Sequence, residues 1–300
     1  MKVLVLGGSG MLGHKLVQRW QDEFDVWTTL RGKFAEYERF RLFDKSKTIE
    51  SLSVLDTPAL ERAIEQVRPE VIFNAVGIVK QVPSAKNTVV TLLINSVLPH
   101  QLAEIAARFG ARLIQISTDC VFEGTRGNYT EDDRPDATDL YGKSKNLGEV
   151  DGANCLTLRT SIIGRELTTE HGLVEWMLGN RGKTVRGYAN AIFSGFPTIV
   201  LADIISNLIR NHRDLAGLYH VSSEPINKFD LLNLIKKSFD VNIEIERFDD
   251  FRIDRSLDST KFRNAIGFAP PSWPDMIERM ARDETPYETW RSELSTITNA

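Results

Sequence analysis

The stretch Val3-Leu-Val-Leu6, followed by Gly7-Gly-Ser-Gly10-Met-Leu-Gly13, decides the fold of this chain. A short continuous apolar run is typical of a parallel strand that is buried on both faces. The residues after it predict a helix with one apolar face, formed by Leu12, Leu16, Val17 and Trp20. Strand, glycine turn and helix start in this order form a cradle for a dinucleotide pyrophosphate, because glycines permit close backbone approach and the helix start offers free N–H groups. We therefore predict an α/β fold with a doubly wound parallel sheet.

The end of the second predicted strand, residues 26–30, indicates which dinucleotide is bound. An acidic residue usually stands there and accepts hydrogen bonds from the ribose 2′-hydroxyl. Here Arg31 follows the strand, and Lys33 is close behind. Because a guanidinium suits a 2′-phosphate, NADPH is the predicted cofactor and NADH is left open. A solvated loop arginine is the alternative interpretation of Arg31.

Two more strand ends complete the predicted cofactor site. Residues 52–56 are expected to form a short strand ending in Asp56, near the adenine, with Thr57 as the cap of the next helix and Pro58 at its first position. Residues 69–77 are expected to form a strand whose small terminal residues let the backbone lie against the cofactor. The predicted cofactor contacts are Gly7, Ser9, Gly10, Met11, Leu12, Gly13, Arg31, Asp56, Asn74, Ala75, Val76, Gly77, Tyr141 and Lys145.

Tyr141-Gly-Lys-Ser-Lys145 places a phenol one helical turn before an amine. A tyrosine hydroxyl has an ordinary pKa of about 10, and a nearby ammonium favours the phenolate, which suits the pair to acid–base chemistry. Two exposed helix residues are the alternative interpretation of such a common spacing. Residues 111–119 predict a buried strand that ends in Ser117, Thr118 and Asp119. Ligands of open α/β sheets bind at the carboxyl ends of strands, so Thr118 is expected to hydrogen-bond a substrate carbonyl beside Tyr141.

Composition excludes several classes of protein. The chain has 300 residues, of which 42% are hydrophobic and 26% charged, so it can bury a sizeable core. A net charge of -4 argues against a nucleic-acid or anionic-membrane surface. The two cysteines, Cys120 and Cys155, suit a reducing compartment. The apolar run at residues 3–6 is too short for a signal or membrane segment, so a cytoplasmic protein is expected.

The three ordered motifs together resemble an extended short-chain dehydrogenase/reductase. The stretches at residues 117–124, 129–133 and 141–149 most resemble the dTDP-4-dehydrorhamnose reductase group, and residues 158–161, 193–198 and 201–203 add to the likeness. The resemblance spans about residues 1–225. It implies a Rossmann-type NADP-binding domain at residues 1–163, with returns near 196–223, and a smaller α/β substrate subdomain at residues 164–195 and 224–300.

The resemblance also implies a reaction. A hydride passes from the nicotinamide to C4 of a nucleotide-activated 4-keto-6-deoxy sugar, in polysaccharide or deoxysugar biosynthesis. Tyr141 donates the proton, Thr118 polarises the carbonyl, and Lys145 holds the nicotinamide ribose and lowers the Tyr141 pKa. The substrate is a nucleoside-diphosphate sugar bound under the C-terminal subdomain.

Two positions refine this expectation. Related sugar-nucleotide 4,6-dehydratases have a glutamate where this chain has Cys120, and a cysteine without a lowered pKa is a poor general base, so dehydration is disfavoured. The reductase group usually has an aromatic residue there, which leaves the sugar open. Some members use acidic residues near the glycine helix for a metal-linked dimer. Lys15 stands in that region, so no metal is predicted, and a homodimer is left open.

The C-terminal third supplies further candidate substrate contacts. Residues 170–178 predict a short helix whose Trp176 either stacks on the sugar or joins the core. Residues 185–195 are expected to form a substrate loop, and residues 261–267 and 273–280 a small helical cap. Arg255 is expected to pair with a diphosphate or, alternatively, with Asp254 or Asp258. The candidate substrate residues are Lys80, Asp119, Cys120, Trp176, Asn190 and Arg255.

Two other functions fit the same motifs. One is a sugar-nucleotide epimerase that holds NAD tightly and returns the hydride. The other is a non-catalytic regulatory subunit that binds NADP, as a vertebrate member of the family does. The presence of Thr118, Tyr141 and Lys145 together weighs against a pure binding subunit.

Overall fold

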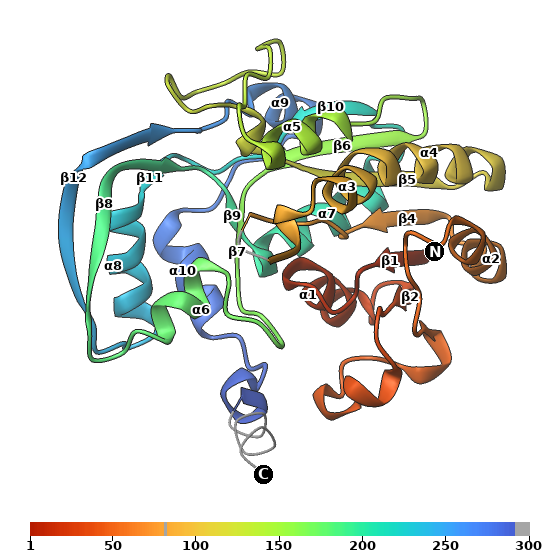
Figure 1. Cartoon of the computed structure of the whole chain (residues 1–300), viewed down its shortest axis with the longest axis horizontal. Coiled ribbons are helices and arrows are strands. Elements are labelled where there is room, and N and C mark those ends of the chain that lie inside the picture. The colour runs from red at the N-terminus through yellow and green to blue at the C-terminus, as the bar shows by residue number, and fades with distance from the viewer. Residues whose placement is uncertain (81–82, 292–300) are drawn as a thin grey trace.

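The computed structural model describes residues 1–80 and 83–291, and a seven-stranded parallel sheet lies at its centre (Figure 1). The strand order is β10-β6-β5-β4-β1-β2-β3. From β1 the chain first adds β2 and β3 on one side, and then adds β4, β5, β6 and β10 on the other side. This doubly wound topology was predicted from the sequence. The strands are β1 (Lys2–Leu6), β2 (Asp25–Thr29), β3 (Thr48–Ile49), β4 (Val71–Asn74), β5 (Arg112–Thr118), β6 (Cys155–Thr160) and β10 (Gly217–His220).

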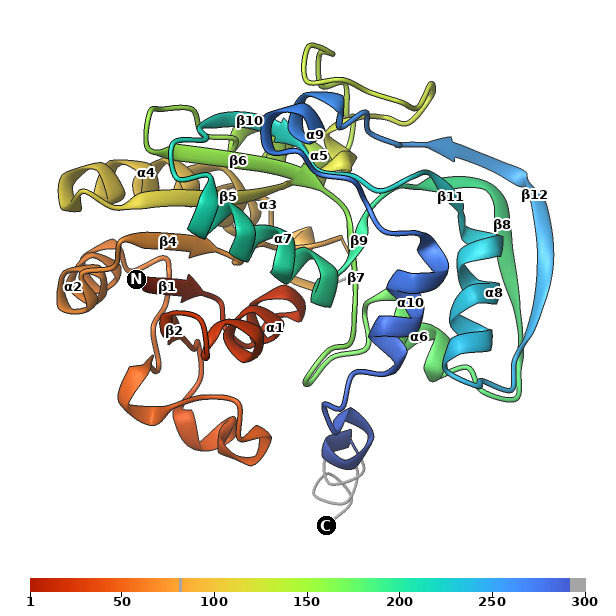
Figure 2. The same ribbon diagram turned by 180° about the vertical axis from the view of Figure 1, so that it is seen from behind.

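Helices cover both faces of this sheet, as Figure 1 and the reverse view in Figure 2 show. Along β1, Val3 and Val5 face α1 (Met11–Trp20) and α7 (Thr198–Asn211). Leu4 and Leu6 face α2 (Thr57–Val67) and α4 (Leu98–Phe109). Because successive strand residues point to opposite faces, an unbroken apolar run is what a strand between two helical layers requires.

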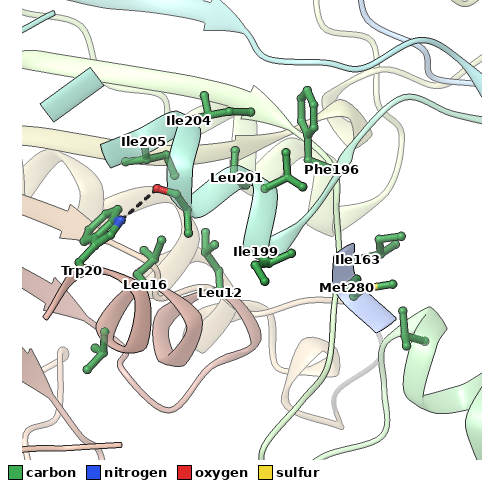
Figure 3. Packing of buried hydrophobic residues seen from close by; sticks show 14 of the residues in the cluster. Leu12, Leu16, Trp20, Ile163, Phe196, Ile199, Leu201, Ile204, Ile205 and Met280 are labelled. Atoms are coloured by element: carbon green, nitrogen blue, oxygen red, sulfur yellow. Dashed lines mark hydrogen bonds between the residues drawn. The ribbon is translucent and has the colours of Figure 1, made fainter. Parts of the chain in front are cut away.

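Helix α1 is held by its apolar face, which packs against α7 (Figure 3). Leu12, Leu16 and Trp20 point toward α7, and the Trp20 indole N–H donates to the Ala202 carbonyl at 3.0 Å. Burying these side chains fixes the helix that follows the glycine turn, and with it the position of the turn itself.

The helical run Thr88–Phe109 combines α3 (Thr88–Leu92), a π-helical turn (Leu93–Val97) and α4. By length and composition it is the one helix in the described ranges that is long and apolar enough to cross a membrane. Its Leu98, Leu102 and Ile105 pack on the sheet, as in a core helix. The π turn widens the helix at Asn95, which is buried.

A second, three-stranded sheet of order β11-β8-β12 lies beside the first (Figure 1). It contains β8 (Thr184–Phe193), β11 (Ile226–Asn227) and β12 (Glu244–Asp254). Helix α8 (Lys228–Ser238) packs on β8, and α10 (Trp273–Ala281) packs on α8. The remaining elements are α5 (Leu140–Leu147), α6 (Leu173–Leu178), α9 (Thr260–Ile266) and a pair of short strands, β7 (Ile162–Ile163) and β9 (Phe196–Pro197).

Three local expectations were wrong. The expected substrate loop at 185–195 is mostly strand β8, whose small residues Ala189 and Ala191 alternate inward and are buried. Residues 52–56 do not form a strand; the neighbour of β2 is the shorter β3. Asp56, not Thr57, caps α2 by accepting from the Ala59 N–H, so the proline lies at the second helical position. Residues 292–300 of the predicted substrate subdomain lie outside the described residues.

Candidate active site

The glycine turn between β1 and α1 has no room for a side chain at Gly7, Gly8 or Gly13. Gly7 has a φ of +82°, a left-handed conformation that favours glycine. A Cβ atom on Gly13 would overlap the Gly7 carbonyl, and one on Gly8 would overlap the Thr28 hydroxyl. The sequence spacing singled out Gly7 and Gly13 but missed Gly8, whose constraint comes from the neighbouring strand β2.

The start of α1 is open to an anion. Gly10 is the N-cap and supplies no side-chain hydrogen bond. The first N–H groups of a helix have no acceptor within the helix, and the helix dipole is positive at this end. A dinucleotide pyrophosphate fits this cradle by the shape of the glycines and by the donors of the helix. Residues from Ser9 to Leu12 are the ones that would hold it.

Of the predicted adenosine contacts, Arg31 follows strand β2, whereas Asp56 stands at the start of helix α2. Arg31 is exposed, directly after β2. The Asp56 carboxylate accepts from the Ala59 N–H at 3.0 Å, so one of its oxygens belongs to the helix cap. The Thr29 hydroxyl accepts from the Gly7 N–H at 3.2 Å and ties β2 to the turn.

The end of β4 is held by two buried amides. Asn74 donates to the Gln115 side chain at 2.7 Å and accepts from the Val76 N–H at 3.1 Å. Both the nitrogen and the oxygen of its side-chain amide are therefore already hydrogen-bonded within the protein. Asn95 binds both the N–H and the carbonyl of Ile78, and donates to the Ser144 hydroxyl at 3.1 Å. Asn95 therefore links the segment after β4, including Gly77, to helix α5.

Helix α5 lies directly against the end of β5. Asp139 caps it by accepting from the Gly142 N–H at 2.8 Å. A Cβ atom on Gly142 would overlap the Cys120 carbonyl, so the glycine lets α5 approach the turn that follows β5. This approach brings the Tyr141 side chain against the end of β5, where Thr118, Asp119 and Cys120 all act on its pKa.

Thr118 is fixed on its other sides as well. Its hydroxyl donates to the Asp119 carboxylate at 3.0 Å and accepts from the Cys120 N–H at 3.1 Å. Burial raises the pKa of Asp119 from its ordinary value. The structure thus joins Thr118, Asp119, Cys120 and Tyr141 at one strand end.

The pKa of Tyr141 is shifted in the direction opposite to the one expected from the sequence. Burial raises the pKa of Tyr141, which is the opposite of the lowering expected from Lys145. The Lys145 ammonium donates to the Ile116 carbonyl at 2.6 Å, and burial lowers the pKa of Lys145 to about 8 despite the opposing effect of Glu149. Burial is the largest cause of the raised Tyr141 pKa, and the neighbouring Cys120, Asp119 and Asp139 add to it, so Tyr141 is a neutral phenol at pH 7.

Four of the candidate substrate residues gather around this centre. The Lys80 ammonium pairs with Asp139 at 2.5 Å and lies 5.5 Å from the Tyr141 ring centroid. Arg255 donates to the Phe122 carbonyl at 2.7 Å and approaches the Cys120 sulfur at 3.9 Å. It does not pair with Asp254 or Asp258, the two alternative partners. Burial, reinforced by Asp119, raises the pKa of Cys120 to about 12.

The other two candidates lie on the second sheet and its flanking helix. Asn190 donates to the Asp249 carbonyl at 2.8 Å, across β8 and β12. Trp176 on α6 is partly exposed. No contact among residues 1–80 and 83–291 joins either side chain to Tyr141.

Lys15, the position that argued against a metal, is buried in α1. Its ammonium pairs with Asp283 at 2.5 Å. Within the described ranges, no group of three or more histidine, cysteine, aspartate or glutamate side chains is placed to hold a metal ion.

Comparison with known proteins adds three findings. A family model described as the RmlD substrate binding domain matches residues 1–285. The spore coat polysaccharide biosynthesis protein SpsK of Bacillus subtilis (strain 168) is 29% identical over 231 residues, which are 75% of this chain and 74% of that protein. The methionine adenosyltransferase 2 subunit beta of Xenopus laevis is 33% identical over 153 residues, but the match covers only 49% of this chain and 41% of that protein.

A solved structure extends the likeness over almost the whole chain. The crystal structure of dTDP-4-dehydrorhamnose reductase from Bacillus anthracis str. Ames in complex with NADP has a TM-score of 0.77 at 24% identity, and the match covers 93% of this chain and 98% of that one. At this level of identity the likeness shows the fold.

Proposed function

The chain belongs to the RmlD substrate binding domain family, and from this premise we propose that it is an NADPH-dependent reductase of a nucleotide-activated 4-keto-6-deoxy sugar. The observation that carries the proposal is the close approach of α5, which carries Tyr141, to the end of β5, where Thr118 is held by Asp119 and the Cys120 N–H. The NADP-bound dTDP-4-dehydrorhamnose reductase of the same fold supports this substrate class. SpsK, named for spore coat polysaccharide biosynthesis, supports a role in making polysaccharide precursors.

Tyr141 is suited to donate a proton in the direction of reduction. A carbonyl that accepts a hydride becomes an alkoxide, which needs a proton from a neutral acid. The raised pKa of Tyr141 keeps the phenol protonated at neutral pH. The single hydroxyl proton of Thr118 goes to Asp119 here. With substrate bound, Thr118 would turn that proton toward the same carbonyl oxygen, while the Cys120 N–H still holds the Thr118 oxygen. A bound nicotinamide supplies the hydride.

Lys145 carries a positive charge on the same helix as Tyr141, one turn further along, and against β5. It is buried, and within the described residues its ammonium donates to a neutral carbonyl, that of Ile116. An ammonium has three donors, so two can serve other acceptors such as the hydroxyls of a ribose. Its charge also stabilises the negative charge that Tyr141 acquires after giving up its proton.

Dehydration is disfavoured by the chemistry of Cys120. Elimination of water from a sugar needs an additional acid–base pair, and a thiol with a pKa of about 12 is protonated at neutral pH. Arg255 and Lys80 add positive charge beside Tyr141, where a sugar nucleotide would be held.

The cofactor turn supports a dinucleotide, and Arg31 supports NADPH. The guanidinium is exposed at the end of β2, which is the position of the adenosine ribose in doubly wound folds. We propose that it binds the 2′-phosphate, and that the enzyme acts in the cytoplasm, where NADPH is supplied.

A non-catalytic subunit is the second candidate, and one observation favours it. The methionine adenosyltransferase 2 subunit beta shares 33% identity over 153 residues, a match that takes in half of this chain. In that case the chain would bind NADP and a partner enzyme without turnover.

The test is an assay of NADPH oxidation with a panel of dTDP- and UDP-4-keto-6-deoxy sugars, with Tyr141→Phe as the control. Oxidation by the wild type, reduced roughly 100-fold or more in the variant, is expected because general acid catalysis contributes about 10²–10⁴. A wild type that oxidises no more NADPH than the variant rejects the reductase. NAD retained through purification points to the epimerase instead, and full partner activation by a Lys145→Ala protein points to the subunit.

A further inference from the structure

The described end of the chain, residues 283–291, packs against the helix that carries the glycine turn. Lys15 of α1 pairs with Asp283 and donates to the Thr285 hydroxyl at 3.1 Å. The Tyr287 ring meets the His14 ring edge-on, with centroids 5.8 Å apart. We call residues 283–291 the C-terminal segment. It is distant in sequence from the turn, yet it is in direct contact with the helix start.

The C-terminal segment is itself anchored on several sides. Arg165 lies 4.7 Å from the Tyr287 ring centroid and pairs with Glu175 at 2.6 Å. Trp290 packs edge-on against Phe40, with ring centroids 5.1 Å apart. The Tyr287 hydroxyl is therefore held in place independently of His14.

His14 is fully buried and makes one hydrogen bond from each ring nitrogen. Its Nδ1 atom lies 2.8 Å from the Gly10 carbonyl, and its Nε2 atom lies 2.7 Å from the Tyr287 hydroxyl. A carbonyl only accepts, so Nδ1 carries the proton and donates it. Nε2 of the neutral ring then accepts from Tyr287. Burial lowers the pKa of His14 to about 3, which keeps the ring neutral.

The Gly10 carbonyl belongs to the peptide that presents the Met11 N–H. A trans peptide is planar, so fixing the direction of its carbonyl also fixes the direction of its N–H. The Met11 N–H is one of the donors at the start of α1 that have no acceptor within the helix. A glycine backbone is less restricted than that of any other residue. A hydrogen bond from the His14 side chain to the Gly10 carbonyl therefore restrains a peptide that would otherwise rotate more freely.

We propose that His14 and Tyr287 are positioning residues for dinucleotide binding, in which Tyr287 sets the His14 tautomer and His14 orients the Gly10–Met11 peptide toward the pyrophosphate. The inference rests on the proposed function only in taking the ligand of the turn to be a dinucleotide. It makes the C-terminal segment part of the cofactor site, although the segment comes from the opposite end of the chain.

The experiment measures the dissociation constant of NADPH by its fluorescence, without sugar, for the full-length wild type and three variants. Tyr287→Phe keeps the ring and removes only the hydroxyl. His14→Ala removes both hydrogen bonds, and His14→Asn restores a donor near the Nδ1 position. We expect NADPH to bind roughly fivefold to tenfold more weakly to Tyr287→Phe and His14→Ala, as the loss of a buried hydrogen bond implies, and His14→Asn to recover part of this loss.

The matched control is Tyr129→Phe. The Tyr129 hydroxyl is also in a buried side chain and accepts from the Thr125 N–H at 3.2 Å, but it lies in a separate cluster of the core. This variant is expected to bind NADPH like the wild type. With saturating NADPH, Tyr129→Phe should also keep a kcat within about twofold of the wild type, because the reacting groups are untouched.

NADPH binding by Tyr287→Phe and His14→Ala equal to that of the wild type overturns the inference. So does weakening that His14→Asn fails to relieve, since that outcome marks a purely structural role. A wild type that binds NADPH but reduces no sugar rejects the proposed reductase and leaves the positioning role intact. A wild type that binds neither NADPH nor NADH overturns both.

Discussion

Two buried lysines, Lys15 in α1 and Lys145 in α5, stand in different surroundings. Only 2% of Lys15 and 7% of Lys145 is exposed, and burial lowers the pKa of both. Lys15 meets the carboxylate of Asp283 and the side-chain oxygens of Gln18 and Thr285. Lys145 donates to a backbone carbonyl, that of Ile116.

The difference separates a structural cation from a functional one. The charge of Lys15 is neutralised inside the protein, where it fastens the C-terminal segment to α1. The charge of Lys145 is not neutralised by direct contact with a carboxylate. Burying a cation with so little compensation destabilises a fold, so we infer a functional role for such a group against the end of β5.

The largest effect is expected for Lys145→Met. The rate of sugar reduction at saturating NADPH should fall roughly 100-fold to 1000-fold, because the charge that supports proton donation by Tyr141 is lost. The free energy of unfolding should not fall, since an uncompensated buried cation is removed. Steady-state kinetics and urea unfolding measure the two quantities. A stable variant with the wild-type rate would remove Lys145 from the active site.

Lys15→Met should show the reverse pattern. The free energy of unfolding should fall by about 3 kcal/mol, because Asp283 is left largely buried without its partner. The kcat at saturating NADPH should stay near that of the wild type. The double variant Lys15→Met/Asp283→Asn should regain part of the lost stability, and a double variant as unstable as the sum of the singles would contradict the pairing.

The pH dependence should also distinguish the two lysines. Lys145 loses its charge as the pH rises through about 8, so kcat/KM should decline above that pH. The unfolded chain retains the ordinary lysine pKa of 10.5, so between about 8 and 10.5 it binds more protons than the folded chain, and this group makes stability rise with pH. The decline in kcat/KM should vanish in a Lys145→Arg variant that remains active, and a decline that persists there would assign the titration to another group.

The smallest effect is expected for a third lysine, Lys80, which lies near the same tyrosine but in solvent. In its ion pair with Asp139, 36% of the Lys80 side chain and 44% of the Asp139 side chain are exposed. Lys80→Met should change the free energy of unfolding by less than about 1 kcal/mol, as exposed pairs do. Activity should fall only severalfold, through weaker attraction of an anionic substrate. A loss of activity in Lys80→Met as large as that in Lys145→Met would mean that the exposure of a lysine does not distinguish substrate attraction from catalysis.

The parts of the fold that were predictable from sequence depend on local signals. Residues adjacent in sequence indicate each of three features: the glycine turn, the apolar strands and the helix that carries Tyr141 and Lys145. Gly8 was missed because its role depends on Thr28, which lies on another strand. For Asn95 the sequence leaves open an exposed helix residue or a structural or proton-relay residue facing the site, because its role depends on Ile78, outside the helix. The pairing of Lys15 with Asp283 joins residues 268 positions apart, and no local pattern indicates it. Strand β8 was mistaken for a loop because its small inward residues, such as Ala189, carry a weak strand signal.

The most direct measurement follows the hydride itself. The protein would be given NADPH deuterated at the transferring position of C4 and a dTDP-4-keto-6-deoxy sugar, and the product analysed by mass spectrometry and NMR. The account predicts one deuterium at C4 of the sugar for each NADP formed, with both signals reduced roughly 100-fold or more by Tyr141→Phe. A sugar that changes configuration without deuterium at C4 or net NADPH oxidation would contradict it.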